Sequence, residues 1–143
     1  MICIPIVGAS MPKALEQITS AEKIADILEL RLDLIDSPDL KVLLNVVSKP
    51  VIVTNRTKLD GGQFRGTDDE RLQALHDALA AGADYVDIEV STPRELLQPF
   101  LEGHETSKII LSYHDFSHTP EDLNPLYETM DALPGGIIKI VTY

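Results

Sequence analysis

Short apolar runs of strand length alternate along this chain with longer segments that carry helix signals. The apolar runs are Ile2–Val7, Ile27–Leu32, Val51–Thr54, Tyr85–Val90, Ile109–Tyr113 and Ile137–Thr142. Regular alternation of strands and helices predicts successive βα units and a parallel sheet, which is an α/β fold. No low-complexity stretch or linker interrupts the pattern, so we expect one domain over residues 1–143.

Helix start and stop signals occupy the segments between the apolar runs. A hydroxyl residue precedes a proline at Ser37-Pro38, Thr92-Pro93 and Thr119-Pro120, as is typical of an N-cap before the first helical residue. Leucines recur at helical spacing over residues 72–79, and Gly82 suits the end of that helix.

Polar side chains share one face of most of these strands. Alternate residues of a strand point to the same side, and a parallel strand covered on both faces should be apolar on both. The residues that break this rule are Glu29 with Arg31, Thr54 with Arg56, Asp87 with Glu89, Ser112 with His114, and Lys139. They lie mostly toward the C-terminal ends of the strands, where an α/β barrel has its catalytic mouth. The pattern therefore favours a functional cluster over a solvated face.

Lys139 is the one charged residue in the apolar run Ile137–Val141. Burial disfavours the charged form of a lysine, and a neutral amine can attack a carbonyl to form an imine. His114 is then the natural general base. Arg31 and Arg56 would keep Lys139 neutral by like-charge repulsion and could hold an anionic substrate. An edge-strand lysine whose ammonium reaches solvent is the structural alternative.

The other polar residues also have structural interpretations. His114 on its own would be a hydrogen-bonded structural histidine, and Glu29 with Arg31 could form an internal salt bridge. We expect Asp87 and Glu89 to orient their neighbours or to serve as structural pairs.

Metal and cofactor chemistry has little support in the sequence. Glu89, His114 and Asp115 could ligate a metal, but they lack a diagnostic spacing, so we predict no metal site. Imine chemistry on a lysine requires no cofactor.

Composition excludes several classes of partner. Hydrophobic residues make up 44% and charged residues 24% of the chain, as in ordinary globular proteins. A net charge of −11 argues against nucleic acid or an anionic membrane surface as a partner. We find neither a stretch of membrane-spanning length nor a signal peptide pattern, so a cytoplasmic protein is expected. The single cysteine, Cys3, lies in an apolar run and is predicted to be a buried, inert thiol.

Four short motifs stand at the ends of the predicted strands: Glu29–Asp33, Thr54–Arg56 with Asp60–Gly62, Ser112–Phe116, and Ile138–Ile140. Their order, intervals and strand positions resemble the type I 3-dehydroquinate dehydratases, and the match runs the length of the chain. The resemblance implies a TIM-type (β/α)8 barrel, for which about 250 residues is typical. This chain would hold about six βα units of such a barrel, with strands seven and eight absent.

The resemblance also implies a reaction, the dehydration of 3-dehydroquinate to 3-dehydroshikimate in the shikimate pathway. Lys139 would form a Schiff base with the ring ketone, and His114 would act as general base and acid. Glu29, Arg31 and Arg56 would bind the substrate.

Asp60 completes the catalytic set that the resemblance implies, because the family has a carboxylate at this position that orients the histidine. The family usually has glutamate there, so the reach of Asp60 to His114 is one methylene shorter.

The open barrel is the second departure from the family. A barrel without two strands exposes two unpaired edges. A second copy could pair with them, so we expect a homo-oligomer, most simply a dimer. The chain could also be a fragment, or the first part of a fusion with shikimate dehydrogenase.

Two other functions stay open on the sequence. One is a different Schiff-base-forming barrel lyase of the aldolase type. The other is a non-catalytic barrel fragment or assembly module that keeps the motifs.

Overall fold

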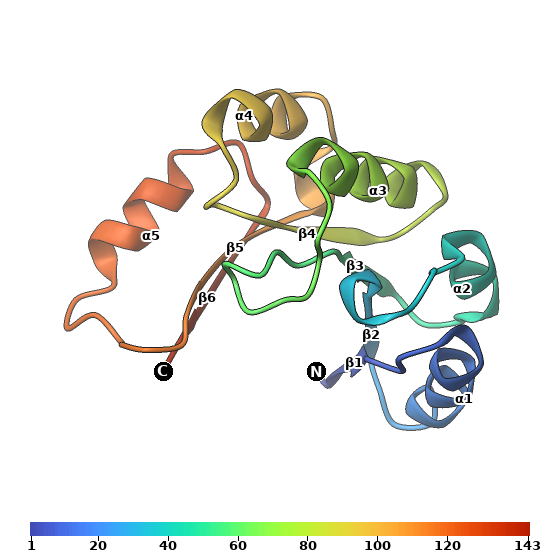
Figure 1. Cartoon of the computed structure of the whole chain (residues 1–143). Helices are drawn as coiled ribbons and strands as arrows, with labels where there is room; N and C mark the ends of the chain where they lie inside the picture. Colours follow the sequence, from blue (N-terminus) through green and yellow to red (C-terminus); the bar gives the residue numbers. More distant parts are fainter.

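Six parallel strands in the order β1-β2-β3-β4-β5-β6 form a sheet that curls into an open half-barrel, with helices on its outer side (Figure 1). This computed structural model describes all residues from 1 to 143. The two termini lie on either side of the opening, next to the two edge strands. The architecture confirms the α/β fold and the incomplete barrel of TIM type.

The strands lie within one or two residues of their predicted positions. They are β1 Cys3–Ile6, β2 Ile27–Arg31, β3 Val51–Thr54, β4 Tyr85–Glu89, β5 Ile109–Asp115 and β6 Ile137–Thr142. The helices are α1 Met11–Ala21, α2 Leu40–Val46, α3 Asp68–Ala80, α4 Arg94–Glu102 and α5 Asn124–Asp131. Short 3-10 turns stand at Leu32–Leu34 and Thr106–Lys108.

The two faces of the sheet differ in chemistry. Leu30, Val53, Ile88 and Leu111 have no exposed surface and belong to the main apolar cluster, which also includes residues of the helices. Register brings the alternate, polar residues of neighbouring strands together on the other, concave face; Glu89, for example, pairs with Ser112. The hydrophobic core therefore lies between sheet and helices, and the concave face is left for polar side chains.

Helix starts were the least accurate part of the sequence prediction. Helix α2 begins after Asp39, whose carboxylate accepts a hydrogen bond from the backbone N–H of Val42 at 3.1 Å. Ser37 instead adopts a left-handed conformation with a φ of 47°. Thr119 lies five residues before the start of α5 at Asn124, so it caps no helix.

The cap expected at Thr92 is also wrong, and a genuine cap was missed. Pro93 is the N-cap of α4, and the hydroxyl of Thr92 donates to the carbonyl of Glu89 at 2.6 Å instead. Thr67 and Glu70 form a capping box at the start of α3. The end of α3 is as predicted, with Gly82 at a φ of +100° that glycine alone tolerates easily.

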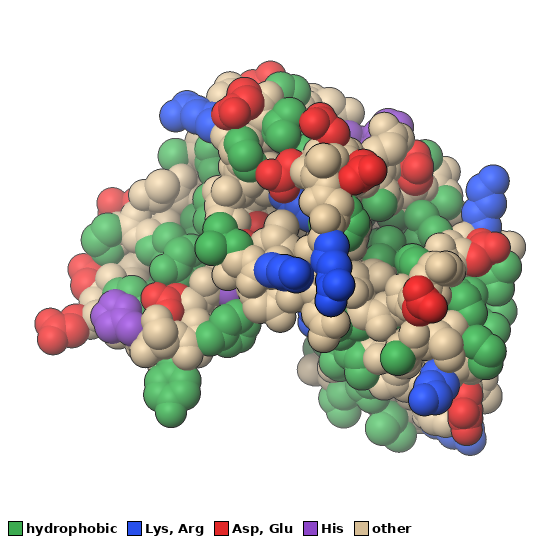
Figure 2. Space-filling view, in the orientation of Figure 1, with side chains coloured by type: hydrophobic (Ala, Val, Ile, Leu, Met, Phe, Trp, Pro, Cys, Tyr) green, Lys and Arg blue, Asp and Glu red, His purple; other side chains and the backbone are tan.

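The edge strands β1 and β6 each have one neighbour, and their apolar side chains remain partly on the surface. Figure 2 shows apolar side chains on the surface around the N-terminal strand and helix. Cys3 is exposed, which corrects the predicted burial of its thiol. The reason is its edge position, since only β2 flanks β1. None of the helices combines the length and hydrophobicity that crossing a membrane requires.

Core packing under α3 gives a stability prediction. Leu75 on α3 has no exposed surface, so Leu75→Ala should lower the free energy of unfolding by about 2–5 kcal/mol through lost burial and a cavity. Leu59 is 81% exposed, and Leu59→Ala should stay within about 0.5 kcal/mol of the parent. Urea unfolding followed by circular dichroism measures both; equal losses would contradict this description of the core.

Candidate active site

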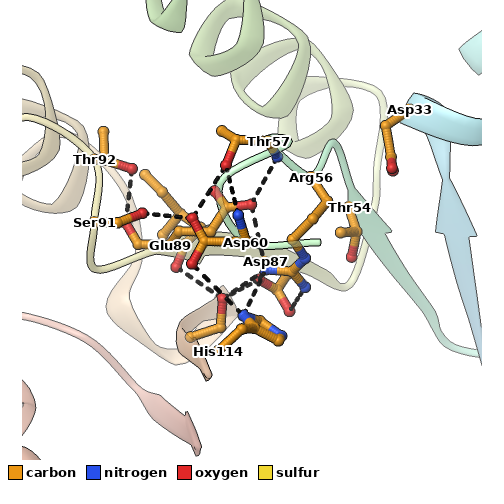
Figure 3. Close-up of polar contacts among 12 residues, drawn as sticks. Asp33, Thr54, Arg56, Thr57, Asp60, Asp87, Glu89, Ser91, Thr92 and His114 are labelled. Carbon is orange, nitrogen blue, oxygen red and sulfur yellow. Dashed lines mark hydrogen bonds and ion pairs between the residues drawn. The ribbon is translucent and has the colours of Figure 1, made fainter. Parts of the chain in front are cut away.

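The polar side chains predicted from the strands converge on the concave face, at the C-terminal ends of the strands. Strands β2 to β6 each contribute at least one of them: Glu29, Arg31, Thr54, Asp87, Glu89, Ser112, His114 and Lys139. Arg56 and Asp60 come from the segment that follows β3 (Figure 3). All six residues predicted for catalysis or substrate binding line one pocket of about 220 Å³.

Arg56 is the centre of this cluster. Its side chain is 4% exposed, and its two terminal nitrogens each lie 2.9 Å from one carboxylate oxygen of Asp87. Nη1 also donates to Ser112 Oγ at 2.8 Å and approaches Glu89 Oε1 at 3.3 Å. Burial alone would lower the pKa of Arg56, but the charges of Asp87 and Glu89 outweigh it and raise the pKa. The guanidinium is therefore permanently charged and fixed in place.

Arg71 on α3 was missed by sequence reasoning although it is the largest fully buried side chain. Its guanidinium pairs with Glu89, and it donates to Asp68 Oδ1 and, at 2.7 Å, to Thr92 Oγ1. A signal was available, because Arg71 precedes Leu75 by four residues on the buried face of the helix. Glu89 thus lies between two arginines, yet burial outweighs them and raises its pKa.

Lys139 contacts carboxylates. Its Nζ lies 2.9 Å from Asp87 Oδ2 and 3.8 Å from Glu29 Oε1, and its side chain is 34% exposed. The charged groups nearest to Nζ are therefore carboxylates. Burial alone would raise the pKa of Asp87, but Arg56 and Lys139 outweigh it and hold that pKa below its usual range. The lysine is both anchored and accessible from the pocket.

His114 is held next to Arg56. Its side chain is 6% exposed, and its Nδ1 lies 3.5 Å from Arg56 Nη1 and 4.0 Å from Asp60 Oδ1. Burial first, and the charge of Arg56 second, lower the pKa of His114 to about 4. The imidazole is therefore neutral at neutral pH, as a general base must be.

Glu29 and Arg31 are oriented by local partners rather than by each other. Thr54 Oγ1 donates to Glu29 Oε1 at 2.7 Å. Arg31 donates twice to Asp33, at 2.9 and 2.8 Å, and this contact raises the pKa of Arg31. The internal salt bridge considered for Glu29 and Arg31 is thus replaced by two separate contacts, and both side chains line the pocket.

No three side chains of His, Cys, Asp or Glu are grouped in a way that could hold a metal ion. The set of Glu89, His114 and Asp115 is not assembled. Glu89 is bound by two arginines, and Asp115 accepts hydrogen bonds from Ser117. The pocket instead offers an amine, an imidazole, carboxylates and guanidiniums, which suit a small carbonyl compound that carries oxygen substituents.

Comparison with known proteins points to one enzyme family. A family model described as type I 3-dehydroquinase matches residues 2–143. A 3-dehydroquinate dehydratase of Methanococcus maripaludis is 35% identical over 147 residues, which cover 100% of this chain and 67% of the relative. A bifunctional 3-dehydroquinate dehydratase/shikimate dehydrogenase of Arabidopsis thaliana is 32% identical, over 99% of this chain and 25% of the relative.

Solved structures show the same fold. A type I 3-dehydroquinate dehydratase from Clostridium difficile superimposes with a TM-score of 0.86 at 22% identity, covering 99% of this chain and 62% of that one. The 3-dehydroquinate dehydratase of Aquifex aeolicus gives a TM-score of 0.69 at 28% identity, covering 99% of this chain and 66% of that one. The chain thus spans about two thirds of the length of these single-function relatives.

The low pKa of His114 can be measured directly. We expect the ring resonances of His114 in NMR to titrate with a midpoint of about 4, well below the ordinary 6.5, because burial and Arg56 disfavour the imidazolium. Spectra of His114→Asn assign the signal. A midpoint near 6.5 would contradict the described environment.

The same shift links stability to pH. Between pH 6.5 and about 4 the unfolded chain binds a proton at His114 that the native chain does not. The contribution of His114 to the free energy of unfolding should therefore fall as the pH is lowered through this window. Denaturation of the parent and of His114→Asn at several pH values measures it, and identical pH dependence of the two proteins would be the contrary result.

Proposed function

The chain belongs to the type I 3-dehydroquinase family, and from this premise we propose that its site dehydrates 3-dehydroquinate to 3-dehydroshikimate. The observation that carries the proposal is one pocket lined by the amine of Lys139 and the imidazole of His114. The reaction needs both groups and no cofactor. We further propose the cytoplasm as its location and no nucleic acid partner.

The first step is imine formation on Lys139. Its neutral amine attacks the ring ketone of the substrate and a C–N bond forms. The nitrogen passes one proton to the carbonyl oxygen, a second proton comes from solvent, and the oxygen leaves as water, so that an N-protonated imine remains. The protonated imine carries a positive charge close to Asp87 and Glu29, which lie 2.9 and 3.8 Å from Nζ. The carboxylates that contact Nζ in the free protein are thus placed to stabilise the charge of the intermediate.

The second step is elimination with His114 as the proton carrier. The protonated imine acidifies the neighbouring C–H, and His114 removes this proton to give an enamine. The enamine electrons expel the hydroxyl at the next carbon, which leaves as water with the proton from the imidazolium. Hydrolysis of the imine then releases the product and restores Lys139.

Substrate binding falls to Glu29 and Arg31, together with Arg56. Glu29 can accept hydrogen bonds from hydroxyl groups, and Arg31 can donate to polar oxygens. Both terminal nitrogens of Arg56 already bind Asp87, so a contact of Arg56 with the substrate would use one of the remaining N–H groups of its guanidinium.

The second candidate is a non-catalytic barrel segment. It is considered because β6, which carries Lys139, has one neighbouring strand, so that the sheet does not close around the pocket. An aldolase-type lyase would use the same imine, so only the choice of substrate distinguishes it.

Borohydride capture tests the imine. Intact mass after mixing the protein with 3-dehydroquinate and borohydride should show one reduced adduct, mapped to Lys139. Lys139→Ala should abolish capture, because no other amine lines the pocket. His114→Ala should still be captured but lose about 10²–10⁴-fold in turnover. Capture that survives the loss of Lys139 would rule out the assignment, and absence of any adduct in a folded sample would favour the non-catalytic segment.

The exposed edges predict self-association. Parallel strands β1 and β6 each present an unpaired edge, and a second copy could pair with both, so we propose a homodimer. Sedimentation velocity should give twice the 15.8 kDa of one chain. A monomer over the micromolar range would contradict this proposal.

A further inference from the structure

The Asp60 carboxylate is anchored through one of its two oxygens. Ser91 donates to Oδ2 at 2.6 Å, and Thr57 donates to the same oxygen at 3.0 Å. The other oxygen, Oδ1, faces Nδ1 of His114 at 4.0 Å (Figure 3). Asp60 itself is 5% exposed. The two hydroxyls therefore fix which oxygen of the carboxylate points toward the imidazole.

The partner of Nδ1 decides which nitrogen of His114 can act as a base. Arg56 only donates hydrogen bonds, so a dominant contact with Arg56 places the lone pair on Nδ1 and the proton on Nε2. Ionised Asp60 only accepts, so a dominant contact with Asp60 places the proton on Nδ1 and leaves the Nε2 lone pair free. Arg56 and Asp60 both lie near Nδ1, and they favour opposite tautomers of the imidazole.

Arg56 is the nearer partner of Nδ1, at 3.5 Å against 4.0 Å for Asp60, but its Nη1 is shared among several acceptors. Its Nη1 already serves Asp87, Ser112 and Glu89 at 2.9, 2.8 and 3.3 Å, and its contact with His114 is the longest of the four at 3.5 Å. One oxygen of Asp60, Oδ1, has no side-chain hydrogen-bond partner and faces the ring. A shift of about 1 Å brings that oxygen from 4.0 Å into hydrogen-bond range.

The loop that carries Asp60 packs against defined neighbours on two sides. Gly61 has a φ of +80°, and a Cβ there would clash with the ring of Phe116, so the loop lies directly on Phe116. The ring of Phe116 in turn stacks on His114 with 5.9 Å between ring centres. On the other side, Ser91 follows β4 in a turn whose next residue, Thr92, is buried and bound to Arg71.

We propose that Ser91 is a positioning residue that, together with Thr57, directs Asp60 at Nδ1 of His114 and so keeps Nε2 free for proton transfer. Aspartate is one methylene shorter than the glutamate usual in the family, and the serine hydroxyl restrains this shorter side chain. This role in turnover rests on the proposed dehydratase function, whereas the effect on the histidine tautomer does not.

The variant Ser91→Ala removes the anchor. Ser91 lies in an exposed turn, so the substitution leaves the fold intact. The nitrogen resonances of His114 should shift toward the form with the proton on Nε2. Turnover of 3-dehydroquinate should fall about tenfold in kcat with KM within twofold, and borohydride capture on Lys139 should be unchanged.

Two further variants separate positioning from a structural effect. Ser91→Thr keeps the hydroxyl and should retain the parental tautomer and kcat. Adding Asp60→Glu to Ser91→Ala should restore both, because the longer side chain reaches Nδ1 without the anchor. The matched control is Ser20→Ala, an exposed serine whose hydroxyl bonds only within α1, and it should change neither quantity.

The outcomes are distinct. The proposal would be overturned if Ser91→Ala left the His114 tautomer unchanged. It would also be overturned if Ser91→Thr lost the parental tautomer as completely as Ser91→Ala. A parental protein without any turnover would refute the proposed function, and the tautomer measurement would still decide the role of Ser91.

Discussion

The bidentate pair between Arg56 and Asp87 is the constraint on which the concave face depends. A buried charge is tolerated only when it is paired and its hydrogen bonds are satisfied. Removal of one partner leaves the other charge buried and unpaired. Here Arg56 and Asp87 also bind Ser112 and Lys139, and Arg71 extends the network to the helix layer through Glu89. No buried side-chain nitrogen or oxygen lacks a partner. The network therefore holds the side chains of Lys139 and His114 in defined positions on the concave face.

The apolar residues of the core and the polar residues of the candidate site lie on opposite faces of one sheet. The outer face carries the apolar residues that pack against helices, and the concave face carries almost all of the charges that matter for the site. Because alternate residues of a strand point to opposite faces, each strand serves both purposes without conflict. A strand such as β4 can hold Ile88 in the core and Asp87 in the site side by side.

The sequence was sufficient for the fold and for the convergence of the candidate site residues, because both depend on the period of two along the strands. Alternation placed Glu29, His114 and Lys139 on one face, and parallel pairing then brought them together. Prediction failed where two nearby residues can both cap a helix, or where the position of a strand in the sheet decides exposure. Asp39 rather than Ser37 caps its helix, and Cys3 is exposed because its strand lies at an edge. The anchor between Ser91 and Asp60 joins two loops that are 31 residues apart, and no local pattern encodes such a contact.

The strand order has a consequence for how the chain reaches this structure. Each strand pairs only with its neighbours in the sequence, so the sheet can grow one βα unit at a time from the N-terminus. Topologies built from contacts of short sequence separation fold faster than those that must first close long loops. The cluster of charges behaves differently, since Lys139 reaches back 52 residues to Asp87. The scaffold can therefore form progressively, while the complete charge network forms only when the last strand is added.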